Sequence, residues 1–191
     1  MRLGHVKALE RLDNQSLIER TVERLSPPAQ KVLVVTSQEQ FGTIATSRLR
    51  TRIISDLYPG KGALGGIYTG LACTDSIYSL VVACDMPFLN RDLLRYLIDC
   101  SDDFDVVVPR LNGLLEPLHA VYSKRCLDPI SKMLEQDGIP IYKLYDQVKT
   151  RYVGEDEIVK FDPEHLSFFN INTVTDLTRA RQLIKHAKNS S

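Results

Sequence analysis

The chain has 191 residues, of which 43% are hydrophobic and 25% charged, close to an average globular protein and too mixed for a disordered one. Its 24 Lys and Arg residues balance its 24 Asp and Glu residues, so it lacks the basic excess typical of proteins that bind nucleic acid. No apolar stretch approaches the ~20 residues needed to span a membrane, so neither nucleic acid nor membrane is an expected partner.

The cysteine pattern argues against a zinc site. The four cysteines are Cys73, Cys84, Cys100 and Cys126, and none of them form a C-x-x-C pair. Their mixed spacing and the absence of a secretory leader predict reduced thiols in a cytoplasmic protein.

Short runs rich in Val and Ile alternate with helical patterns in the first half of the chain. The runs predict strands covered on both faces, because their apolar residues are continuous rather than alternating. These strands are expected at residues 32–35, 52–55, 80–84 and 106–108. Helices are expected at residues 16–25, 64–73 and 92–100, the last with Asn90 as its N-cap. Such alternation predicts an α/β fold with a mostly parallel central sheet and helices on both faces.

The pattern changes after Pro109. Strands are expected at residues 115–123 and 150–153, and helices at residues 125–135 and 141–145. A last helix should run to about Lys188, with Asn172 or Thr173 as its N-cap. Since there is no internal repeat, low-complexity segment or linker, residues 1–191 are expected to form a single domain.

A carboxylate follows the strand expected at residues 80–84. Open α/β sheets bind ligands outside the carboxyl ends of their strands, and Asp85 stands at that place. One carboxylate there can hold Mg²⁺, an ion that keeps several waters and takes phosphate oxygens from its substrate. Alternatively, Asp85 could cap the turn into the next helix, with Pro87 shaping the entry. This segment alone leaves both interpretations open.

Four glycines within seven residues precede a predicted helix. They are Gly60, Gly62, Gly65 and Gly66. Glycine lets backbone N–H groups approach an anion or a flat base, and a helix start favours negative charge. The spacing is not that of a P-loop, and a plain tight turn is the simpler alternative. Asp56, just before the glycines, ends a predicted strand and is a second carboxylate at the same sheet edge.

Basic and amide side chains near the two ends of the chain are further candidates. Arg2, His5 and Lys7 would suit phosphate binding, although an ordinary charged N-terminus has the same composition. Asn170 and Asn172 point to the same side of an extended backbone and could reach a ligand or a bound water. Equally, Asn172 could simply cap the final helix.

Five segments together resemble the molybdenum cofactor guanylyltransferases, a branch of the Rossmann-like nucleotidyltransferases. They are R-L-G-x-x-K-A-L at 2–9, D-x-x-P-G-x-G-x-L-G-G-I at 56–67, A-C-D-M-P-F at 83–88, E-P-L-H-A-V-Y at 116–122 and F-N-I-N-T-x-x-D-L at 169–177. Each motif is weak alone, but the five occur in register and cover nearly the whole chain. The resemblance implies a three-layer nucleotidyltransferase domain.

The resemblance also implies a reaction, the transfer of GMP from GTP to molybdenum-molybdopterin with release of pyrophosphate. Lys7 and Asp85 would be the catalytic residues: Lys7 would bind the GTP phosphates, and Asp85 would bind Mg²⁺ bridging them. The implied cofactor is Mg²⁺, and the implied partners are GTP and molybdenum-molybdopterin as substrates, together with cofactor assembly and acceptor proteins.

By the same resemblance, Asp56 would hold the nucleoside together with the backbone at Gly62 and Gly65. Asn170 and Asn172 would face the metal or the molybdopterin. His119 matches an apolar or variable position of the family, so it is expected to pack within a strand rather than to act as a base.

The chain departs from the family at its start. The family begins with an apolar strand and a glycine-rich loop ahead of the position of Arg2, whereas here Met1 stands directly before Arg2. That strand normally lies in the middle of the sheet. Its absence would leave unpaired backbone groups on both neighbours and a hydrophobic trench between them. The expected explanation is a true start that lies upstream.

Two other functions stay open on the sequence. One is the transfer of another nucleotide or transfer to another acceptor, since the N-I-N-T ending suggests the guanylyl branch only by analogy. The other is a non-catalytic paralogue that binds molybdopterin or partner proteins.

Overall fold

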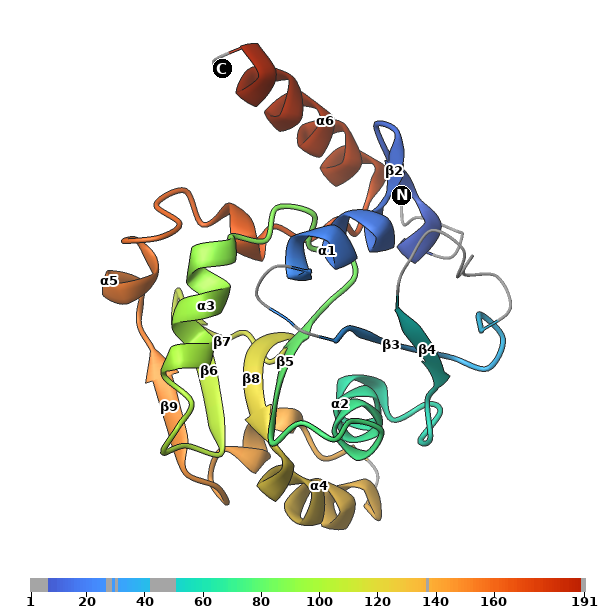
Figure 1. Ribbon diagram of the computed structural model, residues 1–191, viewed down its shortest axis with the longest axis vertical. Coiled ribbons are helices and arrows are strands. Elements are labelled where there is room, and N and C mark those ends of the chain that lie inside the picture. The colour runs from blue at the N-terminus through green and yellow to red at the C-terminus, as the bar shows by residue number, and fades with distance from the viewer. Residues whose placement is uncertain (1–6, 27–28, 30, 42–50, 137, 190–191) are drawn as a thin grey trace.

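The computed structural model describes the chain except residues 1–6, 27–28, 30, 42–50, 137 and 190–191 (Figure 1). Its α-helices are α1 (Leu17–Leu25), α2 (Gly62–Ala72), α3 (Arg91–Asp99), α4 (Leu127–Leu134), α5 (Glu155–Ile158) and α6 (Val174–Asn189). Its 3₁₀ turns are η1 (Lys7–Leu9), η2 (Lys124–Cys126), η3 (Ile141–Leu144) and η4 (Leu166–Phe168). Its strands are β1 (Arg11–Leu12), β2 (Gln15–Ser16), β3 (Leu33–Thr36), β4 (Arg52–Ser55), β5 (Tyr78–Val82), β6 (Val106–Leu111), β7 (Leu114–Leu115), β8 (His119–Ser123) and β9 (Thr150–Val153).

The described strands form a five-stranded sheet and two small ones. The large sheet has the order β5-β8-β6-β7, with β9 also paired to β6. Strands β3 and β4 pair in parallel apart from it, and β1 and β2 form a short hairpin. In Figure 1 the β1–β2 hairpin and α6 lie together at one end of the molecule, and Leu12 of the hairpin shares a buried cluster with Leu177 and Ile184 of α6.

The expectation of a mostly parallel central sheet needs correction, because the sheet is mixed. Strand β8 runs antiparallel to both of its neighbours, β5 and β6. The cause is the turn Asn112-Gly113, whose residues have φ angles of 50° and 77° and fold the chain straight back on itself. A chain that returns through a two-residue turn must run antiparallel, whereas a parallel neighbour needs a long crossover.

Helices cover both faces of the large sheet, as the sequence predicts. Successive strand residues point to opposite faces, so Val106 and Val108 pack with α2 and α4, while Val107 packs with α3. The result is a helix–sheet–helix arrangement in which the ends of the strands are left for a site.

Several predicted elements are confirmed to the residue, and others shift slightly. Strands β4 and β9 occupy the expected positions. The predicted strand at 115–123 is instead two short strands, β7 and β8, and the segment expected as a helix at 125–135 starts as the turn η2. The sequence interpretation had no element for η1, the β1–β2 hairpin, α5 or η4.

The helix caps follow from local chemistry. Ser16 and Glu19 form a capping box at the start of α1, and the Asn90 side chain accepts hydrogen bonds from two N–H groups of α3. At α6 the Thr173 hydroxyl accepts from the Asp176 N–H at 3.2 Å, so Thr173 rather than Asn172 caps that helix. This leaves the Asn172 side chain available for another role.

Strand β5 is less covered than predicted. All five of its residues are half-buried, whereas β8 beside it is buried throughout. Among the described residues, β5 pairs only with β8 and β3 only with β4. That the family's first strand, which is absent before Arg2, would leave unpaired groups on two neighbouring strands stays a prediction.

His119 lies in β8 and agrees with the packing role expected for it. Its side chain has no exposed surface, and its ring lies 4.5 Å from the ring of Phe168 between centroids. Neither ring nitrogen has a partner among the described residues. Burial lowers the pKa of His119 to about 3, because a charged imidazolium would lose its hydration there. The imidazole is therefore neutral across the physiological range.

We expect the free energy of unfolding of the variant His119→Phe to fall less on acidification than that of the wild type. An imidazole in the unfolded chain titrates near pH ~6.5, so between that value and the folded pKa only the unfolded state takes the proton. In this window wild-type stability falls with decreasing pH by up to about 1.4 kcal/mol per unit from this residue. Urea unfolding of both proteins at about pH 7.5 and about pH 4.5 measures the difference. Equal losses of stability in the two proteins would contradict the account.

Candidate functional site

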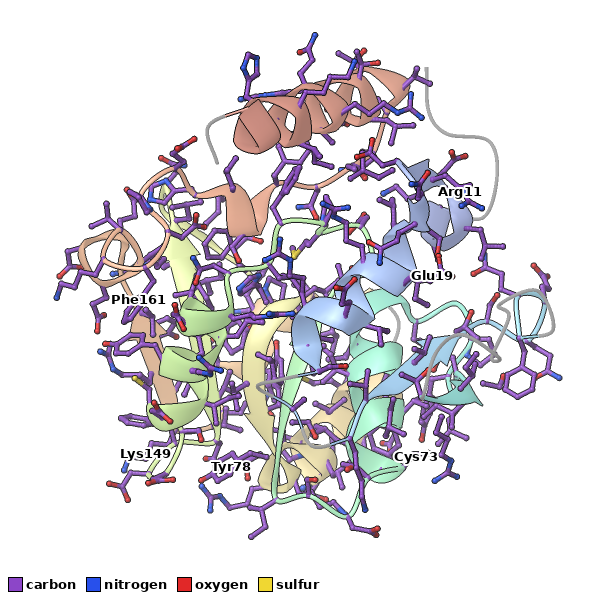
Figure 2. All side chains as sticks on the ribbon, turned by 45° about the horizontal axis from the view of Figure 1, so that its top comes forward. Arg11, Glu19, Cys73, Tyr78, Lys149 and Phe161 are labelled. Atoms are coloured by element: carbon purple, nitrogen blue, oxygen red, sulfur yellow. The ribbon has the colours of Figure 1, made fainter. Side chains whose placement is uncertain are left out.

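Asp85 lies in the loop that follows β5. The start of β5, at Tyr78, lies at the end of the molecule away from Glu19 of α1, so β5 runs toward α1 (Figure 2). The loop is braced by α1, since the Thr21 hydroxyl donates to the Cys84 carbonyl at 3.2 Å. On its other side the Ile171 N–H donates to the Asp85 carbonyl at 3.0 Å. Asp85 is thus fixed beyond the carboxyl end of a strand, as predicted.

Lys7, Asp85 and Asn172 meet in one cluster although they come from distant parts of the sequence. The Lys7 Nζ donates to Asp85 Oδ2 at 2.7 Å and also donates to Asn172 Oδ1. The side chains of Lys7 and Asp85 are 32% and 16% exposed, so the ion pair is partly shielded from water. The Asn172 N–H in turn donates to Asp176 Oδ2 at 3.0 Å, which anchors this residue to α6.

The second Asp85 oxygen bears on the two interpretations of this residue. The start of α3 is already capped by Asn90, so that helix does not need Asp85. Asp85 Oδ1 is buried and has no hydrogen-bond partner among the described residues. A buried acceptor without a donor is costly, and it calls for a ligand, an ion or a water at that position. The geometry favours a binding role over a turn-capping one.

Asp56 follows β4 directly and is held by its own loop. Its Oδ1 accepts hydrogen bonds from the Tyr58 N–H at 3.0 Å and from the Thr69 hydroxyl at 2.8 Å. Its backbone N–H donates to the Thr36 carbonyl of β3 at 2.8 Å. The carboxylate is therefore oriented before any ligand arrives.

The glycines after Asp56 have different roles. Gly62 begins α2 with a φ of +59°, a conformation that other residues adopt only with strain. A Cβ on Gly65 would lie 2.8 Å from the Tyr58 carbonyl oxygen, so Gly65 allows the helix to pack closely on the loop. Gly62 and Gly66 line a pocket next to Asp56, which is described below. Gly65 is not among the described residues that line this pocket.

A pocket of about 270 Å³ lies against Asp56 and against the chain neighbours of Lys7 and Asp85. The described residues that line it are Ala8, Ile18, Val34, Val35, Thr36, Ser37, Gln40, Asp56, Gly62, Gly66 and Cys84. Asp56 lies at its polar wall. Ala8 and Cys84, the chain neighbours of Lys7 and Asp85, belong to its apolar wall. A concave site with an apolar side and a few fixed polar groups is typical of small-molecule binding.

Cys84 contributes a neutral surface to this pocket. Burial, and next the nearby Asp85 carboxylate, raise the pKa of the Cys84 thiol to about 11. The thiol therefore stays protonated and unreactive at neutral pH. All four cysteines are free in this structure, and the redox state of their thiols in the cell stays a prediction.

The sequence interpretation missed Thr36, Ser37 and Gln40 in the pocket lining. A signal for them was present, because they follow a predicted strand just as Asp56 and Asp85 do. Conversely, Asn170 does not join the cluster in this structure: its Nδ2 donates to the Phe168 carbonyl at 3.4 Å.

Two of the predicted phosphate-binding residues, Arg2 and His5, lie outside the described residues. Of the N-terminal basic candidates, Lys7 is the one that the structure places in the site.

The donor atoms around Lys7 suit a hard cation. Asp85 and Asn172 present oxygens, and the Lys7 ammonium already lies between them as a positive charge. In the part of the chain that is described, no group of three or more His, Cys, Asp or Glu side chains gathers to form a complete metal cage. A cation here would thus have few protein ligands and would keep coordination positions for a substrate, the pattern usual for Mg²⁺ with phosphates.

Within the described residues, none of the helices has both the length and the apolar character needed to cross a bilayer.

Comparison with known proteins identifies the family of the chain. Residues 1–151 match the model of the MobA-like NTP transferase domain. A probable molybdenum cofactor guanylyltransferase of Pelotomaculum thermopropionicum is 35% identical over 187 residues, which cover 98% of this chain and 89% of the relative. The molybdenum cofactor guanylyltransferase of Desulfosudis oleivorans is 34% identical over 185 residues, covering 95% and 89% of the two chains.

A solved structure shares both the fold and the sequence. The crystal structure of molybdopterin-guanine dinucleotide biosynthesis protein A from Archaeoglobus fulgidus has a TM-score of 0.84 and 30% identity, with 97% of this chain and 93% of the other covered. The chain therefore belongs to the MobA-like NTP transferases, the family that includes the molybdenum cofactor guanylyltransferases.

Proposed function

We propose that this chain transfers GMP from GTP to molybdenum-molybdopterin, with release of pyrophosphate. The observation that carries the proposal is the meeting of Lys7, Asp85 and Asn172 beside a pocket that also holds the carboxylate of Asp56. One end of this site has a cation and metal-type oxygens, as a triphosphate requires. The other end has an oriented acceptor for a nucleoside. The full-length similarity to molybdenum cofactor guanylyltransferases supports GTP and molybdenum-molybdopterin as the substrates.

The reaction needs positioning and charge neutralisation more than covalent chemistry by the protein. An oxygen of the molybdopterin phosphate attacks the α-phosphorus of GTP, and the bond from that phosphorus to the pyrophosphate oxygen breaks in line with the attack. Lys7 neutralises charge on the phosphates, and Asp56 holds the nucleoside. An ammonium fixed in a partly shielded site is effective because little water competes with it.

Mg²⁺ fits the residues present. Asp85, through its unpartnered Oδ1, and Asn172, through its Oδ1, would hold the ion. When bound, the ion would supply charge neutralisation at the phosphates of GTP. Asn170, which lies on the same segment as Asn172, would face the molybdopterin side.

We also infer that residues 1–191 act as one domain in the cytoplasm. Helix α1 supports the single domain, because its Ile18 and Val22 pack in one cluster with Val34 and Ile53 of the small sheet and with Cys84 after β5. The four free thiols suit a reducing compartment. Proteins that assemble or accept the cofactor are the expected macromolecular partners.

The variant Asp85→Asn tests the proposed function most simply. The substitution keeps the side-chain size but removes the charge that would hold the ion, so we expect GTP-dependent turnover to fall by about 100-fold or more. Pyrophosphate release and chromatography of the dinucleotide product, each with Mg²⁺ and molybdenum-molybdopterin, measure the effect.

Asp92→Asn is the matched control, since Asp92 is 71% exposed at the start of α3 and away from the cluster. This control should keep wild-type turnover. Parallel reactions with CTP and ATP test the nucleotide. Faster product formation from CTP than from GTP would contradict the proposal, and so would full activity of the Asp85→Asn protein.

The variant Lys7→Met should bind a divalent ion more tightly than the wild type when no nucleotide is present. In the free protein the Lys7 ammonium pairs with Asp85 Oδ2 and occupies Asn172 Oδ1, so an ion that binds Asp85 Oδ1 and Asn172 Oδ1 must displace Lys7 from the amide oxygen and is repelled by its charge. Because charge-assisted hydrogen bonds are stronger than neutral ones, we expect the Kd for Mn²⁺ to drop about fivefold or more. Titration followed by electron paramagnetic resonance of free Mn²⁺ gives this Kd.

Lys132→Met changes the net charge equally, but Lys132 pairs with Asp128 on the exposed face of α4. It should leave Mn²⁺ binding unchanged. The Lys7→Met protein should at the same time lose affinity for GTP, because its phosphates lose a cation. Weaker or unchanged Mn²⁺ binding by Lys7→Met would show that Lys7 does not compete for the metal oxygens.

A further inference from the structure

Thr69 is a buried polar residue whose hydroxyl has a defined direction. It lies within α2, and its side chain has no exposed surface. The Thr69 Oγ1 accepts a hydrogen bond from the Leu57 N–H at 3.0 Å and donates one to Asp56 Oδ1 at 2.8 Å. A hydroxyl has a single proton, and here the backbone N–H occupies an acceptor position. The proton of Thr69 is therefore directed to the carboxylate.

This contact fixes one of the two oxygens of Asp56. Oδ1 receives both the Thr69 hydroxyl and the Tyr58 N–H, which together set the plane of the carboxylate. None of the described residues donates a hydrogen bond to Oδ2. Asp56 lines the pocket, so Oδ2 is the oxygen left to accept a hydrogen bond from a ligand there.

The surroundings make the orientation rigid. Helix α2 packs closely on the loop that carries Asp56, because Gly65 lies against the Tyr58 carbonyl. The Lys61 N–H also donates to that carbonyl at 3.2 Å. On the other side, the Asp56 N–H is bonded to Thr36 of β3. Thr69 links the helix to the carboxylate within this frame. Preorganised acceptors bind better because little conformational freedom is lost on binding.

We propose that Thr69 is a positioning residue for nucleotide binding: its hydroxyl orients Asp56 so that Oδ2 accepts a hydrogen bond from an N–H or O–H group of the nucleoside. This inference rests on the proposed function only in assigning the pocket to a nucleotide. It adds a residue that touches no ligand yet determines affinity for the nucleoside half. The triphosphate half, near Lys7 and Asp85, does not depend on it.

The test compares Thr69→Val, which keeps the shape but loses the hydroxyl, with Thr69→Ser, which keeps the hydroxyl. Isothermal titration with Mg²⁺ present gives the Kd of each protein for GTP and for inorganic tripolyphosphate, a probe that lacks the nucleoside. We expect Thr69→Val to weaken GTP binding by about tenfold and to leave tripolyphosphate binding within about twofold of the wild type. Thr69→Ser should stay close to the wild type with both probes.

Two results would overturn the inference. Wild-type affinity of Thr69→Val for GTP would show that the hydroxyl does not matter, and equal weakening of GTP and tripolyphosphate would show a merely structural role. Should Thr69→Val not fold, Thr69→Cys, whose thiol donates only weakly, replaces it with the same two expectations. Failure of the proposed function is recognised separately, because the wild type would then not bind GTP. In that case the Thr69 variants would be compared with whichever of CTP, UTP or ATP the wild type binds.

Discussion

The site depends on one ion pair, in which the Lys7 ammonium is held between Asp85 and Asn172. This contact joins a residue near the N-terminus, a loop in the middle of the chain and a segment just before the last helix. A partly buried carboxylate is tolerated only with a compensating charge, so the three segments are stabilised together. The Asn172 Oδ1 that accepts from Lys7 is also a proposed ligand of the divalent ion, together with the second oxygen of the same Asp85 carboxylate, Oδ1. The resting ion pair and the proposed metal site are therefore alternative states of one cluster.

The fold brings this cluster together through a small number of buried polar contacts. The Asn90 N–H donates to the Ser167 hydroxyl, and its side-chain amide donates to the Phe161 carbonyl. The start of α3 is thus tied to the segment that leads to Asn172. Asp162 is itself buried and accepts hydrogen bonds from two backbone N–H groups of that segment, including the Ser167 N–H. These contacts help to hold the C-terminal part of the site in position.

Sequence patterns predicted the positions of most elements because those positions depend on local chemistry. The Asn90 cap is an example, and it was predicted correctly. The mostly parallel sheet was predicted wrongly, although Asn112-Gly113 is a strong hairpin signal that was present in the sequence. The apolar content of a strand says which faces are buried, but the turn that precedes it decides which way the strand runs. A mixed sheet therefore needed that turn to be recognised.

The candidate site was predictable in part for the same reason. Carboxylates after strands pointed to Asp56 and Asp85, but the same rule was not applied to Thr36. Asn172 could not be assigned from sequence, because a cap and a ligand-binding amide share its local pattern. The Thr173 hydroxyl at the start of α6 shows that Thr173 is the cap, and the ligand-binding role of Asn172 stays a proposal. The role of Thr69 could not be predicted from the sequence for another reason. Its contact with Asp56 spans 13 residues and forms only when the helix and the loop pack together.

The central claim is that Lys7 and a divalent ion exchange places at Asp85 when nucleotide binds. A crystal structure with Mn²⁺ and a non-reactive GTP analogue, with the ion located by its anomalous signal, tests this most directly. The account predicts Mn²⁺ within about 2.5 Å of an Asp85 oxygen and the Lys7 ammonium moved onto the phosphate oxygens. An ion bound elsewhere, with Lys7 still paired to Asp85, would contradict it.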